Sequence, residues 1–320
     1  MLGKIGIVGG GNIGGVLVQE IARRNLAKEI GLMDPVPPDF AKGKCLDIAE
    51  GTPIIGKDIK FTAGKEYDVL KGSEILINTA GVPRKPKPDG TIPTREELLT
   101  TNLKITLMVA EGISKNCPDA TIISIANPLD AIVYTLHKSL KSPKNKLMGQ
   151  SGALDSSRYR YFCALEAGVS VENVEAMVLG GHGDTMVPIR SCCRIAGMPI
   201  DKFIASDKLE AIEKRTRGAG GEVVKLLGVG SAFVSPAWGA LEMVEAIAYD
   251  KKYIMPVCAL LEGEYGVNGL FVGVPVILGK DGVEKIIEVD MTDAEKEAFK
   301  NSANAVQKTF NEVDEMLKTL

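Results

Sequence analysis

The sequence is poor in several residue types, and each shortage argues against a class of protein. Its 320 residues include only two histidines and six cysteines, and no spacing among them is typical of a metal site. The net charge is −3 without a basic stripe, which argues against a nucleic-acid partner. No apolar run is long enough to span a bilayer, and no signal-peptide pattern is present. We therefore expect a cytoplasmic chain with reduced thiols, no metal and no membrane partner.

The first half predicts an α/β fold. Up to Met148, apolar runs without a polar face alternate with amphipathic segments, which is typical of a doubly wound (Rossmann) parallel sheet with helices on both faces. The expected strands are Ile5–Val8, Ile30–Met33, Ile59–Thr62, Ile75–Thr79, Thr121–Ser124 and Lys146–Met148. The expected helices are Ile13–Arg24, Arg95–Asn116 and Pro128–Leu140.

The pattern changes after Gly149, where short turns between strands predict an antiparallel α+β lobe. Thr292 and Glu295 form a capping-box pattern, which predicts the start of a C-terminal amphipathic helix. We predict two domains, residues 1–148 and residues 149–320. The other expected helices are Leu154–Ala167, Leu209–Leu227 and Ser235–Tyr249, and the expected strands are Val174–Leu179, Met186–Ile195, Tyr253–Leu261, Leu270–Leu278 and Val283–Val289.

A glycine-rich segment between the first strand and the first helix predicts a dinucleotide site. The pattern G-x-G-x-x-G allows a tight turn, close approach of a pyrophosphate and close packing of helix on strand. Asp34 ends the next strand about 20 residues later, where a carboxylate binds ribose hydroxyls and repels a 2′-phosphate. The domain 1–148 is thus expected to bind NAD. The expected loop contacts are Gly9, Gly11, Asn12, Ile13 and Gly14.

Two short motifs carry the candidate catalytic groups. His182 stands in the glycine-rich turn Gly180–Asp184 after an apolar run, which predicts an imidazole exposed at a strand end. Asp155 and Arg158 are three residues apart and share one helix face. Together they supply a titratable base, a carboxylate that orients it and a fork for a substrate carboxylate. An ordinary surface histidine is the plain alternative, which these neighbours disfavour.

Two further segments are expected at the carboxyl end of the sheet, where ligands bind in such folds. Asn127 precedes Pro128 after an apolar strand, so its amide is expected to face a ligand, to cap the next helix, or to do both. The segment Gly81–Arg95 is rich in proline, glycine and basic residues. It predicts a loop that closes over the crevice and brings Arg84 and Arg95 to the substrate.

These segments together resemble the lactate/malate dehydrogenase superfamily, most closely its lactate-dehydrogenase-like malate dehydrogenases. The likeness continues through Gly230–Phe233 and Phe271–Pro275. It implies a homotetramer or homodimer in the cytoplasm that oxidises (S)-malate reversibly to oxaloacetate with NAD, a reaction of the tricarboxylic acid cycle.

The resemblance also implies a role for each site residue. His182 would be the acid/base, oriented by Asp155, and Arg158 would hold the carboxylate next to the reacting carbon. Arg95 would polarise the carbonyl, and Arg84 would pair with the second carboxylate. The implied substrate contacts are Arg84, Arg95, Asn127 and Arg158, and the implied cofactor contacts include Asn102 and Asn127.

Two features depart from that family. The loop from Arg84 to Arg95 is several residues longer than usual, as in a lactate-specific offshoot in which a tryptophan replaces the arginine. This chain keeps Arg84, and its only tryptophan, Trp238, is far away in sequence. Gln150 stands where the family usually has a methionine beside the nicotinamide.

Three alternatives differ in what they require. A lactate or broader 2-hydroxyacid dehydrogenase would share the same catalytic groups. A non-catalytic NAD-sensing module would have no use for Asp155, Arg158 and His182 together. An NAD-dependent glycosidase would need a metal site built from cysteine and histidine, for which the sequence offers no pattern.

Overall fold

Six parallel strands form the centre of the molecule in a computed structural model, which describes residues 1–83, 94–228 and 230–320. Their order in the sheet is β6-β5-β4-β1-β2-β3, a doubly wound arrangement as predicted. Strands β4 and β5 are buried at every position because helices cover both faces of the sheet. The strands are β1 (Leu2–Val8), β2 (Ala27–Met33), β3 (Lys60–Gly64), β4 (Ile75–Asn78), β5 (Thr121–Ser124) and β6 (Leu147–Gly149).

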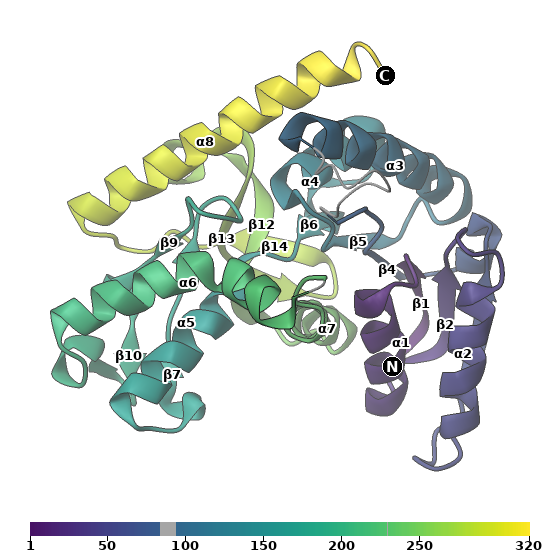
Figure 1. Cartoon of the computed structure of the whole chain (residues 1–320), viewed down its shortest axis with the longest axis horizontal. Helices are drawn as coiled ribbons and strands as arrows, with labels where there is room; N and C mark the ends of the chain where they lie inside the picture. The colour runs from purple at the N-terminus through teal and green to yellow at the C-terminus, as the bar shows by residue number, and fades with distance from the viewer. Residues whose placement is uncertain (84–93, 229) are drawn as a thin grey trace.

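Four helices accompany these strands. Helix α1 packs against α2 and against α7 (Val234–Ala248), whereas α3 packs against α4 on the other side of the strands (Figure 1). Helix α3 has the predicted bounds, and a capping box of Thr94 and Glu97 starts it. The four helices are α1 (Asn12–Arg24), α2 (Phe40–Gly51), α3 (Arg95–Asn116) and α4 (Leu129–Ser139), of which α2 was not expected from the sequence.

Three antiparallel strands of the second half extend the same sheet. Cys258 of β12 pairs with Gly149 of β6, so the sheet continues through β12, β13 and β14 to nine strands. The antiparallel arrangement was expected, but the joining of these strands to the parallel sheet was not. Pairing with β12 protects the open edge of β6. The strands are β12 (Tyr253–Glu262), β13 (Asn268–Gly279) and β14 (Gly282–Ile286).

The remaining strands of the second half are short and form two small sheets. The apolar run Val174–Leu179, expected as one strand, is divided between them, because Val178 N–H donates to Ser156 Oγ at 3.0 Å instead of continuing the first pairing. One sheet holds β7 (Val174–Glu175), β10 (Arg194–Ile195) and β11 (Met198–Pro199), and the other holds β8 (Val178–Leu179) and β9 (Val187–Pro188). Short 3-10 helices are Tyr67–Leu70, Lys144–Lys146, Val171–Asn173, Arg190–Cys192, Ile200–Lys202 and Glu264–Gly266.

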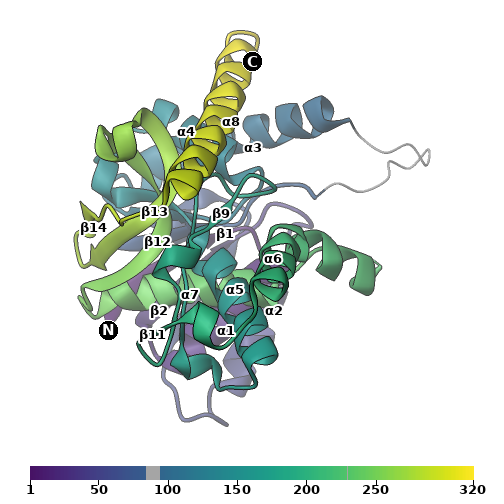
Figure 2. The ribbon, with the colours of Figure 1, turned by 90° about the vertical axis from the view of Figure 1, so that its left-hand side faces the viewer.

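Three long helices complete the second half. Helices α5 (Gly152–Ala167) and α6 (Ser206–Leu227) pack on each other, and α8 (Asp293–Leu317) lies across β13 and α4 (Figure 2). The predicted capping box is present, since Thr292 Oγ1 accepts the Glu295 N–H and Glu295 accepts the Thr292 N–H. Among the described residues, no helix combines the length and hydrophobicity needed to cross a membrane.

One hydrophobic core joins the two halves. It includes Ile77 and Ile123 of the parallel strands together with Val257, Phe271 and Phe310 of the second half. A smaller core lies under α5 and α6, around Tyr159 and Leu209. The shared core and shared sheet hold the two halves together, and α5 starts close to the carboxyl end of β6.

Candidate active site

His182, Asp155 and Arg158 meet at one place in the second half. His182 Nδ1 lies 2.7 Å from Asp155 Oδ2, and Arg158 Nη1 donates to Asp155 Oδ1 at 3.1 Å. The Asp155 side chain is 2% exposed, and the side chains of His182 and Arg158 are each 15% exposed. One buried carboxylate therefore holds a base and a cation that are both largely buried, whereas the sequence predicted an exposed imidazole. The Nδ1 contact leaves Nε2 of His182 for another partner.

The backbone explains why these groups converge. Asp155 lies in the first turn of α5, which starts directly after β6, and Arg158 follows one helical turn later. His182 follows β8, where Gly180 pairs with Gly273 of β13 through two main-chain hydrogen bonds of 2.9 Å. Gly180 has a φ of +90°, a conformation that favours glycine. Helix and turn are thus both anchored to the central sheet.

The neighbours of His182 favour its charged form. Burial alone would lower the pKa of the imidazole, but the carboxylate of Asp155, through its charge and hydrogen bond, and the charge of Asp130 raise it above its usual value. Arg158 opposes this with a smaller lowering effect. A histidine whose pKa is raised by a fixed carboxylate is suited to donate and accept a proton near neutral pH.

The sequence analysis missed the role of Asp130 at this site, although it belongs to the motif around Asn127. Asp130 Oδ2 accepts the main-chain N–H of His182 at 3.1 Å. Burial raises the pKa of the Asp130 carboxyl to about 6. The contact links α4 to a turn 52 residues away, which local sequence patterns do not reveal.

The glycine-rich loop has the shape that a pyrophosphate site requires. A Cβ at position 14 would lie 2.0 Å from the Gly9 carbonyl oxygen, so only glycine allows this close packing of α1. Gly9 has a φ of +98°, which suits the tight turn. Gly11 is exposed and nothing lies within 4 Å of a Cβ placed there, and Asn12 and Ile13 begin α1. The open helix N-terminus fits the phosphates of NAD.

Asp34 closes the far side of this loop. Its Oδ2 accepts the Gly10 N–H at 2.6 Å and its Oδ1 accepts the Val36 N–H at 3.0 Å. The carboxylate is thus fixed at the end of β2, as the ribose assignment requires. Lys44 of the unexpected helix α2 donates to the Gly11 carbonyl at 3.2 Å and places a cation beside the loop. No sequence pattern drew attention to Lys44, because α2 buries only Ala41 and Cys45.

The two predicted asparagines lie at the carboxyl end of the parallel strands. Asn127 is exposed, so its amide is free to face a ligand, and it caps no helix. Asn102 is buried: it donates to the carbonyl oxygens of Val82 and Asn127 and accepts the Val82 N–H at 2.8 Å. The observed contacts of Asn102 connect the start of the segment Gly81–Arg95 to Asn127.

The structure describes only one of the two arginines that were expected to reach the substrate. Arg84 lies outside the described residues. Arg95, at the start of α3, is 74% exposed and lies 3.6 Å from Glu312 of α8. The structure does not bring Arg95 to His182, Asp155 and Arg158, so its predicted contact with substrate requires the start of α3 to move.

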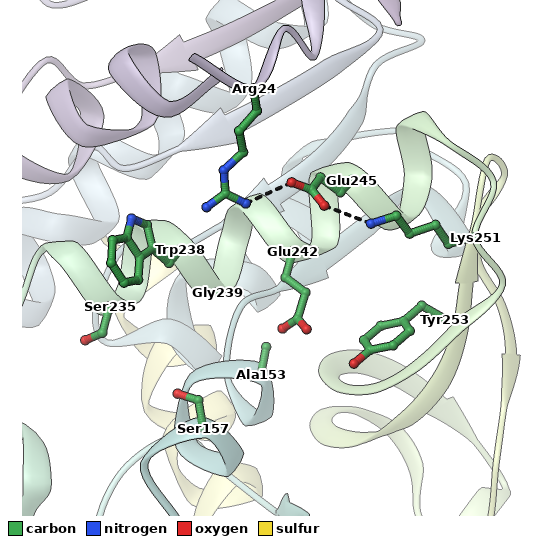
Figure 3. A pocket seen from close by; sticks show the side chains of 10 residues that line it. All are labelled: Arg24, Ala153, Ser157, Ser235, Trp238, Gly239, Glu242, Glu245, Lys251 and Tyr253. Carbon is green, nitrogen blue, oxygen red and sulfur yellow. Dashed lines mark hydrogen bonds and ion pairs between the residues drawn. The ribbon is translucent and has the colours of Figure 1, made fainter. Parts of the chain in front are cut away.

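Gln150 and a nearby cavity lie beside helix α7. Gln150 follows β6 and is 2% exposed, and its Nε2 has no hydrogen-bond partner in the described part of the chain. That nitrogen lies against Gly239, where a Cβ would be 2.3 Å away. A cavity of about 470 Å³ lies between α1, α5 and α7, and Figure 3 shows Arg24 and Lys251 reaching Glu245 from opposite sides. None of the predicted site residues lines it, so we assign it no catalytic role.

Comparisons with known proteins identify the family of both halves of the chain. Residues 3–149 match the NAD-binding domain of lactate/malate dehydrogenases, and residues 152–317 match the alpha/beta C-terminal domain of the same family. A malate dehydrogenase of Rhodopirellula baltica is 44% identical over 314 residues, which are 98% of each chain.

The similar solved structures include malate dehydrogenases and lactate dehydrogenases. Malate dehydrogenase from Salinibacter ruber has a TM-score of 0.92 at 40% identity and covers 99% of each chain. Lactate dehydrogenase from Cryptosporidium parvum, in complex with lactic acid and nicotinamide adenine dinucleotide, has a TM-score of 0.92 at 38% identity and covers 98% of each chain. This chain belongs to the lactate/malate dehydrogenase family and is an NAD-dependent oxidoreductase.

Proposed function

We propose that this chain catalyses the reversible oxidation of (S)-malate to oxaloacetate, with His182 as the acid/base. Malate dehydrogenases that are 44–48% identical to this chain support malate as the substrate. The single observation that carries the acid/base chemistry is the 2.7 Å contact between His182 Nδ1 and Asp155 Oδ2, with Arg158 on the other oxygen of the same carboxylate. A titratable base and a carboxylate-binding fork then stand side by side, as a 2-hydroxyacid substrate requires.

The chain's own residues account for the proton transfer. Bound NAD supplies the hydride acceptor at its nicotinamide ring. His182 Nε2 takes the hydroxyl proton of malate, because Nδ1 is held by Asp155 and donates to it. Asp155 stabilises the imidazolium that results, and the same proton returns to the substrate oxygen when oxaloacetate is reduced. Arg158 holds the carboxylate beside the reacting carbon through its free guanidinium nitrogens.

Three further residues complete the proposed substrate site. Asn127, exposed at the end of β5, bonds the substrate oxygen and the cofactor side. Arg95 polarises the carbonyl once the loop has closed, which stabilises charge in the transition state. Arg84 pairs with the distal carboxylate, the group that distinguishes malate from lactate, and its unpaired charge would penalise lactate.

The proposal also covers the roles of the two domains, the oligomeric state and the cellular compartment. We assign cofactor binding to residues 1–148, with Asn102 on the cofactor side, and catalysis to residues 149–320. We place the enzyme in the cytoplasm, where thiols stay reduced, because its six cysteines are all unpaired. The family resemblance adds a homodimer or homotetramer that acts in the tricarboxylic acid cycle.

A comparison of two substrates tests the proposal. The purified chain is assayed for NADH oxidation with oxaloacetate and, side by side, with pyruvate. We expect kcat/KM for oxaloacetate to exceed that for pyruvate by at least about 100-fold, the difference made by an unpaired buried cation. A preference for pyruvate would instead support a lactate dehydrogenase, like the related Cryptosporidium parvum enzyme. NADH binding without turnover of either substrate would support an NAD-sensing module.

A further inference from the structure

Asp130 connects the segment that follows Asn127 with the turn Gly180–Asp184, which holds His182. It lies in the first turn of α4, three residues after Asn127, and its Oδ2 accepts the His182 N–H at 3.1 Å. Its Oδ1 accepts the thiol of Cys258 on β12, with a sulfur–oxygen distance of 3.7 Å. The carboxyl group thus connects helix α4, strand β12 and the histidine turn.

Gly181, which precedes His182, leaves room for this contact because it has no side chain. A Cβ at Gly181 would lie 3.1 Å from Asp130 Oδ2 and 2.7 Å from a methyl group of Val306. The Gly181 N–H donates to Ser302 Oγ of α8 at 2.9 Å, so the turn is held from both sides. The second glycine of the Gly-Gly-His motif therefore allows the close approach of Asp130 to the main chain of His182.

The donors to Asp130 are a main-chain amide and a thiol. In the described part of the chain, no lysine or arginine forms an ion pair with it. The Cys258 thiol is fully buried and its pKa is raised well above the usual value, so it remains a neutral donor. The negative charge of Asp130 consequently has one nearby positive partner, the imidazolium of His182.

The charged groups that face His182 come from two helices. Asp155 and Arg158 act from α5, and Asp130 acts from α4. The groups that face Asp130 are His182, Cys258 and, more weakly, Asp155. Asp130 is thus the second carboxylate that acts on the imidazole, and the only one of the two that also holds its main chain.

We propose that Asp130 is a positioning residue of the reaction, whose carboxylate fixes the His182 turn against α4 and supplies a second negative charge to the imidazole. The proposal rests on the proposed role of His182. It predicts that Asp130 affects protonation of His182 even when no substrate is bound.

Two variants separate the hydrogen bond from the charge. Asp130→Asn keeps an oxygen that can accept the His182 N–H and removes the charge. Asp130→Ala removes both. Asp207→Asn is the matched control, because Asp207 also lies in the first turn of a helix, α6, and is exposed. All three are made in full-length chain that also carries His137→Gln, which leaves His182 as the only imidazole.

Imidazole NMR titration without substrate and the kcat for oxaloacetate are measured for each variant. We expect Asp130→Asn to lower the pKa of His182, and Asp130→Ala to lower that pKa as well and to reduce kcat at least about tenfold. Asp207→Asn should change neither. An unchanged His182 titration in both Asp130 variants would overturn the proposal, and a fall in thermal stability alone would mean that Asp130 only supports the fold. Because the titration needs no substrate, inactivity of the parent chain with oxaloacetate would count against the proposed function instead.

Discussion

His182 and Asp155 are separated by 27 residues, yet Nδ1 of the imidazole lies 2.7 Å from Oδ2 of the carboxylate. The other oxygen of Asp155 accepts Arg158 Nη1 at 3.1 Å. One buried carboxylate therefore contacts both the proposed base and the proposed substrate-binding cation. A change at Asp155 should alter the pH dependence of the reaction as well as its rate.

Asp155→Asn tests that dependence. The pKa of His182 is raised in the folded chain, so oxaloacetate reduction, which needs the imidazolium, should stay fast above pH 6.5 and decline as the pH rises through that raised pKa. Malate oxidation, which needs the neutral base, should increase over the same interval. In Asp155→Asn the decline should move to lower pH and kcat should fall by about two orders of magnitude. A pH–rate profile that keeps its position would contradict the assignment of Asp155.

Asp34 should set the choice of cofactor. Its carboxylate is fixed by the N–H groups of Gly10 and Val36, and it would repel a 2′-phosphate. The unaltered chain should prefer NADH strongly over NADPH, and Asp34→Ser combined with Val36→Arg should shift kcat/KM toward NADPH at least about tenfold. Asp39→Ser is the control, since Asp39 is exposed and pairs only with Lys42 among the described residues. Equal use of both cofactors by the unaltered chain would refute the ribose assignment.

Arg84 should decide between oxaloacetate and pyruvate. Arg84→Gln should lose about 2–5 kcal/mol of transition-state stabilisation toward oxaloacetate, the range for breaking a desolvated charge pair. The transition state for pyruvate reduction should lose little stabilisation, because the variant no longer leaves a cation unpaired beside the methyl group of pyruvate. A variant with a shortened segment Lys87–Pro93 serves as the comparison. It should change the ratio of kcat/KM for oxaloacetate to kcat/KM for pyruvate less than Arg84→Gln does. The opposite pattern would assign specificity to the longer loop.

Glu29 should stabilise the fold in a pH-dependent way. It is 19% exposed on β2, and although burial opposes ionisation, its bonds to Lys4, Lys60 and Thr62 lower the pKa of the carboxyl to about 2. The stabilisation is present above the unfolded-state pKa near 4.3 and is lost as the pH falls toward 2.

Glu29→Gln should cost about 2 kcal/mol in the free energy of unfolding at pH 7 and much less at pH 2.5, measured with a denaturant. Glu111→Gln, which removes an exposed pair with Lys115, is the matched control and should have little effect at either pH. Equal losses at both pH values would show that Glu29 acts through packing and not through its charge.

Local patterns predicted the elements whose hydrophobic period was strong. Helix α1 and the C-terminal helix α8, whose apolar residues lie on one face, and the capping box at Thr292 are present as expected, because each depends on residues within one turn or one face. Helix α2 (Phe40–Gly51) was missed, since it buries only Ala41 and Cys45 and has almost no apolar stripe.

Features that depend on distant pairing were not visible in the sequence. The antiparallel strands join the parallel sheet through Cys258 and Gly149, which are far apart in the chain. The contact of Asp130 with the His182 main chain depends on the same packing. In contrast, Asp155 and Arg158 could be placed on one face from their spacing alone.

The most direct test of the account is the loss of His182. The variant His182→Asn keeps a side chain of similar size without a titratable nitrogen, so we expect NADH binding within about twofold of the unaltered chain and a kcat for oxaloacetate reduced by about 10²–10⁴-fold. His137→Asn is the matched control, because His137 lies in the last turn of α4 and packs edge-on against Phe271. Oxaloacetate turnover near the normal rate in His182→Asn would contradict the central claim that this imidazole carries the proton.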